Sequence, residues 1–335
     1  MNKRRKRRRG VYISPVMLLS AAAVLALAAA IVLLPGRGGG DVLPPEESAA
    51  PSAQPTQPDQ STQPTQPAQP PATATLSDGT VCDLTQLGED AVYTGSLVLV
   101  NNWTCYHFPE EEELVNVFEQ KNGQYIVART DILLRQEAMD ALNRMLSDFR
   151  AQGGSRTVNV VAGHRTAEFQ QHLFDQSAAR NGLDHAKQFV AQPGGSEHHT
   201  GLVVDLSVML SDGSSRDYDG TGEYAWINEN CHNYGYIVRY AADKASLTGI
   251  ADEPWHFRWL GVPHATQAVK EGLCMEEYID YLKDFTVEEP LTISCADGAY
   301  EVWYAAGTEV YLPRSGEYEV SGNNVDGVIV TRRIG

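Results

Sequence analysis

The chain has 335 residues, 43 of them Asp or Glu and 26 Lys or Arg, which gives a formal net charge of −17 at pH 7. Seven of the basic residues stand in the first ten positions, so the remaining chain has 19 basic against 43 acidic residues, a charge of −24. So acidic a chain is poorly suited to hold a polyanion by bulk electrostatics, which argues against nucleic acid as a partner.

The first 34 residues predict a membrane anchor. Residues 1–10, MNKRRKRRRG, form a basic tail, and residues 11–34 contain no charged side chain. A helix of about 20 apolar residues crosses the hydrocarbon layer, whereas the apolar core of a secretory signal peptide is shorter. We therefore expect a cytoplasmic tail (1–10) and a single transmembrane helix (11–34), with a cleaved signal peptide as the alternative. Both interpretations place everything after Leu34 on the extracytoplasmic side of the cell membrane.

Residues 35–75 are rich in Pro, Gln, Thr, Ala and Gly, a composition that buries almost no apolar surface. They predict a disordered, extended linker that tethers a folded region to the membrane. All five cysteines follow this linker, in a part of the chain where disulfides can persist. Their odd number leaves at least one cysteine without a partner within the chain.

Residues 76–285 predict a domain in which helices and strands mix. Apolar residues at helical spacing predict helices over 131–154 and 166–182, the second with Thr166 as its N-cap, and a further helix over 223–235. The β-rich runs are SLVLVNN (96–102), TVNVVAG (157–163), YIVRY (236–240) and EPWHFRWL (253–260). Two short helices then end near Phe285. Because the elements do not alternate regularly, the fold class is expected to be α+β.

Residues 286–335 differ in character from the domain before them. Short β-rich runs alternate there with Gly and Asn turns, as in GEYEVSGNNVDGVIVTRR. This pattern predicts a small β-rich C-terminal module.

The stretch SEHHTGLVVDL, Ser196 to Leu206, holds the first candidate site residues. LVVDL is a short apolar strand, and a carboxylate such as Asp205 is costly to bury unless it is paired or bound to a cation. His198 and His199 precede Gly201, where the chain can turn and bring one of them to Asp205. Taken alone, the stretch fits an ordinary polar loop as well as a metal site.

A second stretch, DEPWHFRW, supplies Glu253 and His256. In an extended strand these two side chains face opposite ways, so the backbone has to bend if they are to converge. Two histidines and an aspartate match the ligands of catalytic zinc, which keeps one position for water, and Glu253 is then available as a proton acceptor. Arg165, between a strand and a helix, supplies a cation for a carboxylate or an oxyanion. Arg258 is expected to be a surface arginine near this site.

The four stretches GHRTAEFQQHLF, SEHHTGLVVDL, YGYIVRY and EPWHFRWLG occur in the order typical of the VanY-type D-alanyl-D-alanine carboxypeptidases, zinc peptidases of bacterial cell walls. The chain resembles this family from about residue 96 to residue 285. The resemblance implies a central antiparallel sheet flanked by helices. It also implies a Zn2+ ion held by His198, Asp205 and His256, with Glu253 as the catalytic base.

The resemblance assigns further roles around the ion. Arg165 falls on a catalytic and substrate-binding arginine, and Gln170 and Ser196 on substrate contacts. His199 becomes a neighbour that lines the pocket. His164 and Thr166 stand where the family usually has Tyr and Ser, which puts the fine specificity in question rather than the metal.

The sequence thus predicts an extracytoplasmic, membrane-anchored zinc carboxypeptidase with peptidoglycan stem peptides as its partners and substrates. We expect this enzyme to remove the C-terminal D-alanine, as a D,D-carboxypeptidase. Cleavage of tetrapeptide stems at an L,D bond and cleavage of free D-Ala-D-Ala are alternatives within the same chemistry. A non-catalytic, zinc-containing wall-binding module is the alternative from another class.

Overall fold

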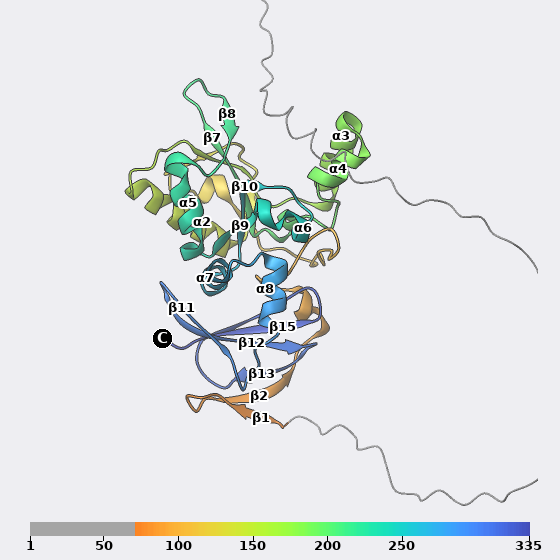
Figure 1. Cartoon of the computed structure of the whole chain (residues 1–335), viewed down its shortest axis with the longest axis vertical. Coiled ribbons are helices and arrows are strands. Elements are labelled where there is room, and N and C mark those ends of the chain that lie inside the picture. The colour runs from red at the N-terminus through yellow and green to blue at the C-terminus, as the bar shows by residue number, and fades with distance from the viewer. Residues whose placement is uncertain (1–70) are drawn as a thin grey trace, which may run out of the picture. The chain divides into compact units, whose positions relative to one another are not determined.

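The structure, a computed structural model, describes residues 71–335 (Figure 1). The predicted cytoplasmic tail, transmembrane helix and nearly all of the linker lie outside these residues. Between residues 71 and 335, no helix combines the length and the apolar character that crossing a membrane requires.

The described residues form a mixed fold of helices and strands. The α-helices are α1 (Val117–Gln120), α2 (Gln136–Ala151), α3 (Ala167–Asn181), α4 (Leu183–Phe189), α5 (Ala225–Asn230), α6 (Ala245–Thr248), α7 (Val262–Glu271) and α8 (Met275–Leu282). The strands are β1 (Thr73–Thr75), β2 (Val81–Gln86), β3 (Val115–Asn116), β4 (Ile126–Val127), β5 (Leu133–Leu134), β6 (Val158–Ala162), β7 (Val203–Met209), β8 (Ser215–Asp217), β9 (Tyr236–Tyr240), β10 (Glu253–Trp259), β11 (Leu291–Cys295), β12 (Gly298–Ala306), β13 (Glu309–Pro313), β14 (Tyr318–Gly322) and β15 (Gly327–Arg333).

The central sheet carries the strands from which the site is built. Its order is β4-β6-β7-β10-β9, and β8 pairs with β7 outside this path. All neighbouring pairs are antiparallel except β4 with β6. The middle strand β7 is buried from Val203 to Val208, so polar side chains within it lie in the interior of the domain.

Helix α2 covers the sheet with an apolar face. Its buried residues, among them Leu142, Met145 and Phe149, belong to the same core as Val160 of β6 and Val204 of β7. Each such side chain contributes roughly 1.5–3 kcal/mol when fully buried. The helix begins at residue 136 rather than near the predicted 131, because residues 133–134 pair as β5 with β3.

The β-rich C-terminal region is completed by strands from the other end of the described chain. Residues 286–335 form β11 to β15 as the pattern predicts, in the sheet β11-β12-β15-β14 and as β13 of a second sheet, β1-β2-β13. The sequence predicts residues 73–75 as part of the linker and residues 76–95 as part of the peptidase domain. In the structure β1 pairs with β2 and β2 with β13, which satisfies backbone groups that β13 would otherwise leave unpaired.

The β-rich region also shares a core with the peptidase domain, which the predicted boundary at residue 286 did not anticipate. Ile237 of β9, Ala265 of α7 and Tyr278 of α8 lie in one apolar cluster with Ile293 of β11 and Val302 of β12. The fold from residue 71 onward is therefore held together by cores that cross this boundary.

The stretch 96–102 is not a strand, contrary to its β-rich composition. Its backbone groups bond to other segments: Leu97 N–H donates to Ser321 Oγ, and Leu99 N–H donates to the Asn323 carbonyl. The carbonyls of Ser96 and Val98 both accept from Arg258 Nη2 at 2.9 Å. These bonds replace a strand ladder. None of the five cysteines, all in the described residues, forms a disulfide.

Candidate metal centre and active site

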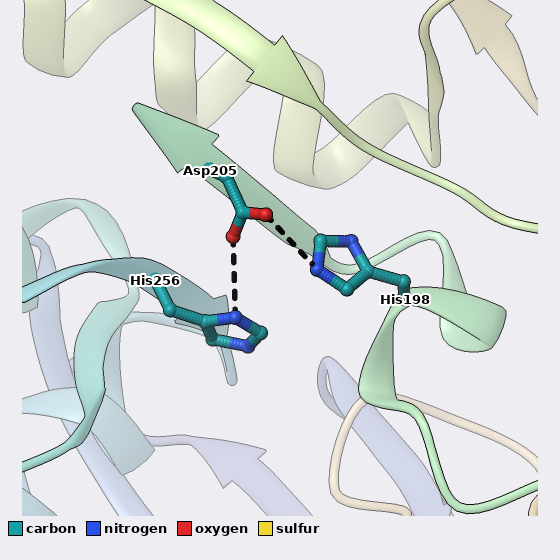
Figure 2. Close-up of side chains that lie close together, drawn as sticks. All are labelled: His198, Asp205 and His256. Carbon is teal, nitrogen blue, oxygen red and sulfur yellow. Dashed lines mark ion pairs between the residues drawn. The ribbon is translucent and has the colours of Figure 1, made fainter. Parts of the chain in front are cut away.

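Three side chains from β7, β10 and the turn before β7 meet within the central sheet (Figure 2). His198 lies in the 3-10 helix Glu197–Thr200, Asp205 in β7 and His256 directly opposite Asp205 in β10. His198 Nε2 is 3.2 Å from Asp205 Oδ2, and His256 Nδ1 is 3.2 Å from Asp205 Oδ1. One ligand atom from each residue lies within 4.8 Å of the other two.

Two glycines allow His198 to reach this position. Gly201 ends the 3-10 helix at φ 68°, and a Cβ there would lie 2.7 Å from Leu114 Cδ2. The Gly163 carbonyl accepts a hydrogen bond from His198 Nδ1 at 2.7 Å, and a Cβ on Gly163 would lie 2.4 Å from the Leu133 carbonyl oxygen. The bond from Nδ1 fixes the imidazole with Nε2 turned toward Asp205.

The three donors fit a zinc ion. Asp205 Oδ1 is buried and has no hydrogen-bond partner among the described residues, which is costly for a carboxylate unless a cation completes its surroundings. Two imidazoles and one carboxylate are a ligand set that catalytic zinc uses, with a further coordination position left open. Burial lowers the pKa of His198 to about 4, which favours the neutral imidazole that binds a metal. Against the effect of burial, the contacts with Asp205 and Glu197 raise the pKa of His256 to about 9, so a metal that binds there displaces a proton.

Glu253 lies at the start of β10, on the same side as the three donors. Its Oε2 is 3.5 Å from His256 Nδ1. The pairing of β10 with β9 shifts register between Glu253 and Phe257, which is the backbone irregularity that the i, i+3 spacing requires if both side chains are to converge. Burial raises the pKa of the Glu253 carboxyl above its ordinary value, so that this pKa lies nearer to neutral pH than that of an exposed glutamate.

Arg165 faces the donors from the loop between β6 and α3. Its Nη2 is 3.1 Å from Asp205 Oδ2, and its Nη1 is 3.5 Å from Gln170 Oε1. Gln170 is held in turn, because its Nε2 donates to the Ala191 carbonyl at 2.8 Å. Thr166 caps α3 by accepting from Phe169 N–H, as its position before the helix predicts.

All seven residues that the sequence analysis assigned to the metal, the base and the substrate line one cavity of about 420 Å³. They are Arg165, Gln170, Ser196, His198, Asp205, Glu253 and His256. Tyr240 and Trp255, which the sequence analysis did not select, also line it, and the Tyr240 ring centroid lies 4.8 Å from that of His256. The cavity thus holds a potential metal site, a carboxylate that is able to move a proton, and a cation.

Glu197 is the main residue that the sequence analysis missed. Its side chain is fully buried, with Oε1 2.8 Å from Arg239 Nε and 3.1 Å from Arg258 Nη1, and Oε2 3.5 Å from His256 Nε2. A carboxylate behind a ligating histidine orients its ring and increases its basicity. Arg258 is completely buried and not the expected surface arginine. The signal was present in the sequence, because an arginine inside each of two buried strands needs a carboxylate partner.

His199 does not line the cavity, contrary to the expectation for this neighbour of His198. Its Nδ1 donates to the Arg165 carbonyl at 2.7 Å, and its Nε2 accepts from Gly194 N–H at 3.1 Å. The adjacent histidines therefore have separate tasks. His198 offers a nitrogen to the metal position, and His199 ties together the two loops that flank it.

Comparison with known proteins gives a consistent result. The family model described as VanY, D-alanyl-D-alanine carboxypeptidase, matches residues 131–262. A D-alanyl-D-alanine carboxypeptidase of Enterococcus faecium is 33% identical over 250 residues, which are 72% of this chain and 77% of the relative.

Two solved structures extend the comparison. The vancomycin resistance D,D-dipeptidase VanXYg, in complex with a D-Ala-D-Ala phosphinate analogue, is 29% identical with a TM-score of 0.68, over 76% of this chain and 99% of its own. A mutant of the D,D-pentapeptidase VanY from a VanB-type resistance cassette, in complex with Zn(II), is 31% identical over 55% of this chain and 98% of its own, with a TM-score of 0.45.

Proposed function

The chain belongs to the VanY family of D-alanyl-D-alanine carboxypeptidases, which are zinc hydrolases, and we propose that it removes the C-terminal D-alanine from peptidoglycan stem peptides. One observation carries the proposal. The buried residues His198, Asp205 and His256 line the same cavity as Glu253 and Arg165. The metal ligands, the base and the arginine that binds the substrate therefore lie together.

His198, Asp205 and His256 would hold the zinc ion. When bound there, zinc polarises the scissile carbonyl and lowers the pKa of a water molecule. The protein supplies only one negative charge to the ion through these three ligands, so the site stays electrophilic. Arg165, 3.1 Å from Asp205, adds a second positive group on the same side.

Glu253 moves the proton. In the proposed reaction it accepts a proton from the attacking water while the water oxygen forms its bond to the scissile carbon. It then delivers that proton to the nitrogen of the departing D-alanine as the carbon–nitrogen bond breaks. A carboxyl whose pKa burial has raised is suited to both steps, because it holds the proton more readily than an exposed glutamate between them.

Arg165 and its neighbours Gln170 and Ser196 position the substrate. Arg165 can bind the terminal carboxylate of a peptide, or the oxyanion that forms during attack, with two hydrogen bonds. Gln170 restrains the guanidinium from one side. Ser196 lines the same cavity and offers a hydroxyl to the peptide.

The test is D-alanine release by the purified full-length protein. A pentapeptide stem, a tetrapeptide stem and free D-Ala-D-Ala are assayed in parallel, with and without a chelator and with zinc added back. We expect release from the pentapeptide that the chelator abolishes and zinc restores. Faster release from the tetrapeptide favours the L,D reaction, faster cleavage of the dipeptide favours a dipeptidase, and binding of zinc without any release favours a wall-binding module.

For the location we propose a cell-membrane protein whose catalytic domain lies outside the cytoplasm. The support is in the sequence, where a basic tail precedes the uncharged segment 11–34. The proposed substrate, a wall peptide, requires the same location. Fractionation of cells that produce the full chain tests the anchor, and protease treatment of intact cells tests the orientation. Recovery of an intact chain from the cytosol contradicts both.

A further inference from the structure

The cavity extends well beyond the residues that perform the chemistry, along one face of α3. Six residues of this helix line it, namely Gln170, Leu173, Gln176, Ser177, Arg180 and Asn181. One side of the helix carries Gln170, Leu173, Ser177 and Arg180, at spacings of three, four and three residues, and Gln176 and Asn181 lie directly beside Ser177 and Arg180. Gln170 is the end nearest the reaction, since it contacts Arg165, and Arg180 is the far end.

The length of this face matches a peptide rather than a single amino acid. Helices rise 1.5 Å per residue, so Gln170 and Arg180 are separated by about 15 Å along α3. An extended peptide covers about 3.3–3.6 Å per residue, so the same distance corresponds to about four peptide residues. The α3 face can therefore lie alongside the part of a substrate that precedes the scissile bond.

The charges along the cavity are unevenly distributed. Its inner part contains the carboxylates Glu197, Asp205 and Glu253, and its inner cation Arg165 already faces Asp205. Arg180 is the other arginine that lines it, and no ion pair or hydrogen bond of its guanidinium is found among the described side chains. A second negative group on the substrate, besides the terminal carboxylate that Arg165 can bind, therefore has Arg180 as the cation that lines the cavity and is unpaired among the described side chains.

We propose that Arg180 recognises a carboxylate of the peptide substrate, about three or four residues to the amino-terminal side of the scissile bond. This rests on the proposed function, and it names the preferred substrate class as extended, acidic peptides rather than D-Ala-D-Ala alone. A guanidinium binds a carboxylate through two parallel hydrogen bonds, which gives specificity for an acid over its amide. Leu173, between the two ends of the face, supplies an apolar contact for the peptide.

The experiment compares two pentapeptides that end in D-Ala-D-Ala and differ only in one group three residues before the scissile bond, a free carboxylate or its amide. Full-length wild-type protein and the variants Arg180→Gln and Arg180→Lys are assayed with both. Arg156→Gln is the matched control. Arg156 is exposed and lies outside the cavity, and its substitution by Gln removes the same charge from the protein.

For the wild-type protein and the Arg156→Gln control we expect kcat/KM to be about tenfold higher for the acid than for the amide, mainly through KM. Arg180→Gln removes this preference by lowering kcat/KM on the acid alone, and Arg180→Lys retains part of it. Equal kcat/KM on both peptides in the wild type, or equal losses on both in Arg180→Gln, overturns the inference while D-alanine release still supports the proposed function. Absence of release from either peptide by the wild-type protein overturns both.

Discussion

His256 and Asp205 occupy directly opposite positions on the antiparallel strands β10 and β7, with His256 Nδ1 3.2 Å from Asp205 Oδ1. This register brings together two residues 51 positions apart in the chain. His198 joins them because the chain turns at Gly201 immediately before β7. The proposed metal site is therefore rigid, since two of its ligands are fixed by the strand ladder.

Substitution of the two adjacent histidines separates their tasks. We expect His198→Ala to lose zinc, because its Nε2 is one of the three donors. His199→Ala should retain zinc and lose part of its activity, because His199 holds the Arg165 carbonyl rather than the ion. Zinc content per purified chain and D-alanine release are measured for both. A His199→Ala protein as depleted of zinc as His198→Ala contradicts this division.

Glu253→Gln tests the base. The amide keeps the size of the side chain but cannot accept the proton, so kcat should fall by a factor of about 10²–10⁴. Zinc content should not change, because Glu253 is not among the three donors. Undiminished D-alanine release by Glu253→Gln is incompatible with the proposed mechanism.

The pH dependence of kcat/KM should report the ionisation of the Glu253 carboxyl. Glu253 accepts a proton only when it is ionised, so kcat/KM falls as pH falls through its pKa. Because burial raises this pKa, we expect the midpoint of the acid limb above 4.5, the ordinary value for a glutamate. Zinc content is measured at each pH so that loss of metal is not mistaken for protonation of Glu253. A midpoint at or below 4.5 with zinc retained is the contrary result.

Glu197→Gln should weaken both the fold and the metal site. The change removes the negative charge that pairs with the buried guanidinium groups of Arg239 and Arg258. The free energy of unfolding should fall by about 3–5 kcal/mol. It also removes the carboxylate that faces His256, which should lower zinc affinity about 10- to 100-fold.

Glu276→Gln is the matched control for Glu197→Gln, because Glu276 also pairs with Arg239. It should lower the free energy of unfolding without changing zinc affinity. The two variants are compared by denaturant unfolding and by zinc titration. Equal zinc affinities in the two proteins would show that Glu197 has no role in orienting His256.

His264 should make stability depend on pH independently of the metal site. It lies buried between the Tyr278 and Thr331 hydroxyls, and burial lowers its pKa to about 3 from an ordinary value of 6.5. Because the pKa of His264 is lower in the folded than in the unfolded state, its contribution to the free energy of unfolding is complete above pH 6.5. This contribution is lost as the pH falls below 6.5. Between pH 7 and pH 4 this amounts to about 3 kcal/mol. His264→Gln should show a correspondingly smaller loss over this interval in denaturant unfolding; an identical loss contradicts the assignment.

Much of the fold followed from local pattern. The apolar spacing of α2, the Thr166 cap of α3 and the β-rich runs of β6, β9, β10 and the C-terminal region all predicted the elements found. These features act within a few residues of one another, so composition and spacing reveal them. The stretch 96–102 was misread because its β-rich composition resembles a strand, whereas its backbone bonds depend on Arg258, about 160 residues further along the chain.

What the sequence determined by itself was the chemistry available: two histidines, an aspartate, a glutamate and an arginine in motifs of a known order. Only the tertiary structure decided which atoms meet. The β7–β10 register set Asp205 opposite His256, Glu197 became the buried partner of two arginines, and β2 paired with β13 rather than joining the peptidase domain. These outcomes depend on contacts between distant segments, and such contacts are fixed by which surfaces bury together, a property of the whole chain that no single motif contains.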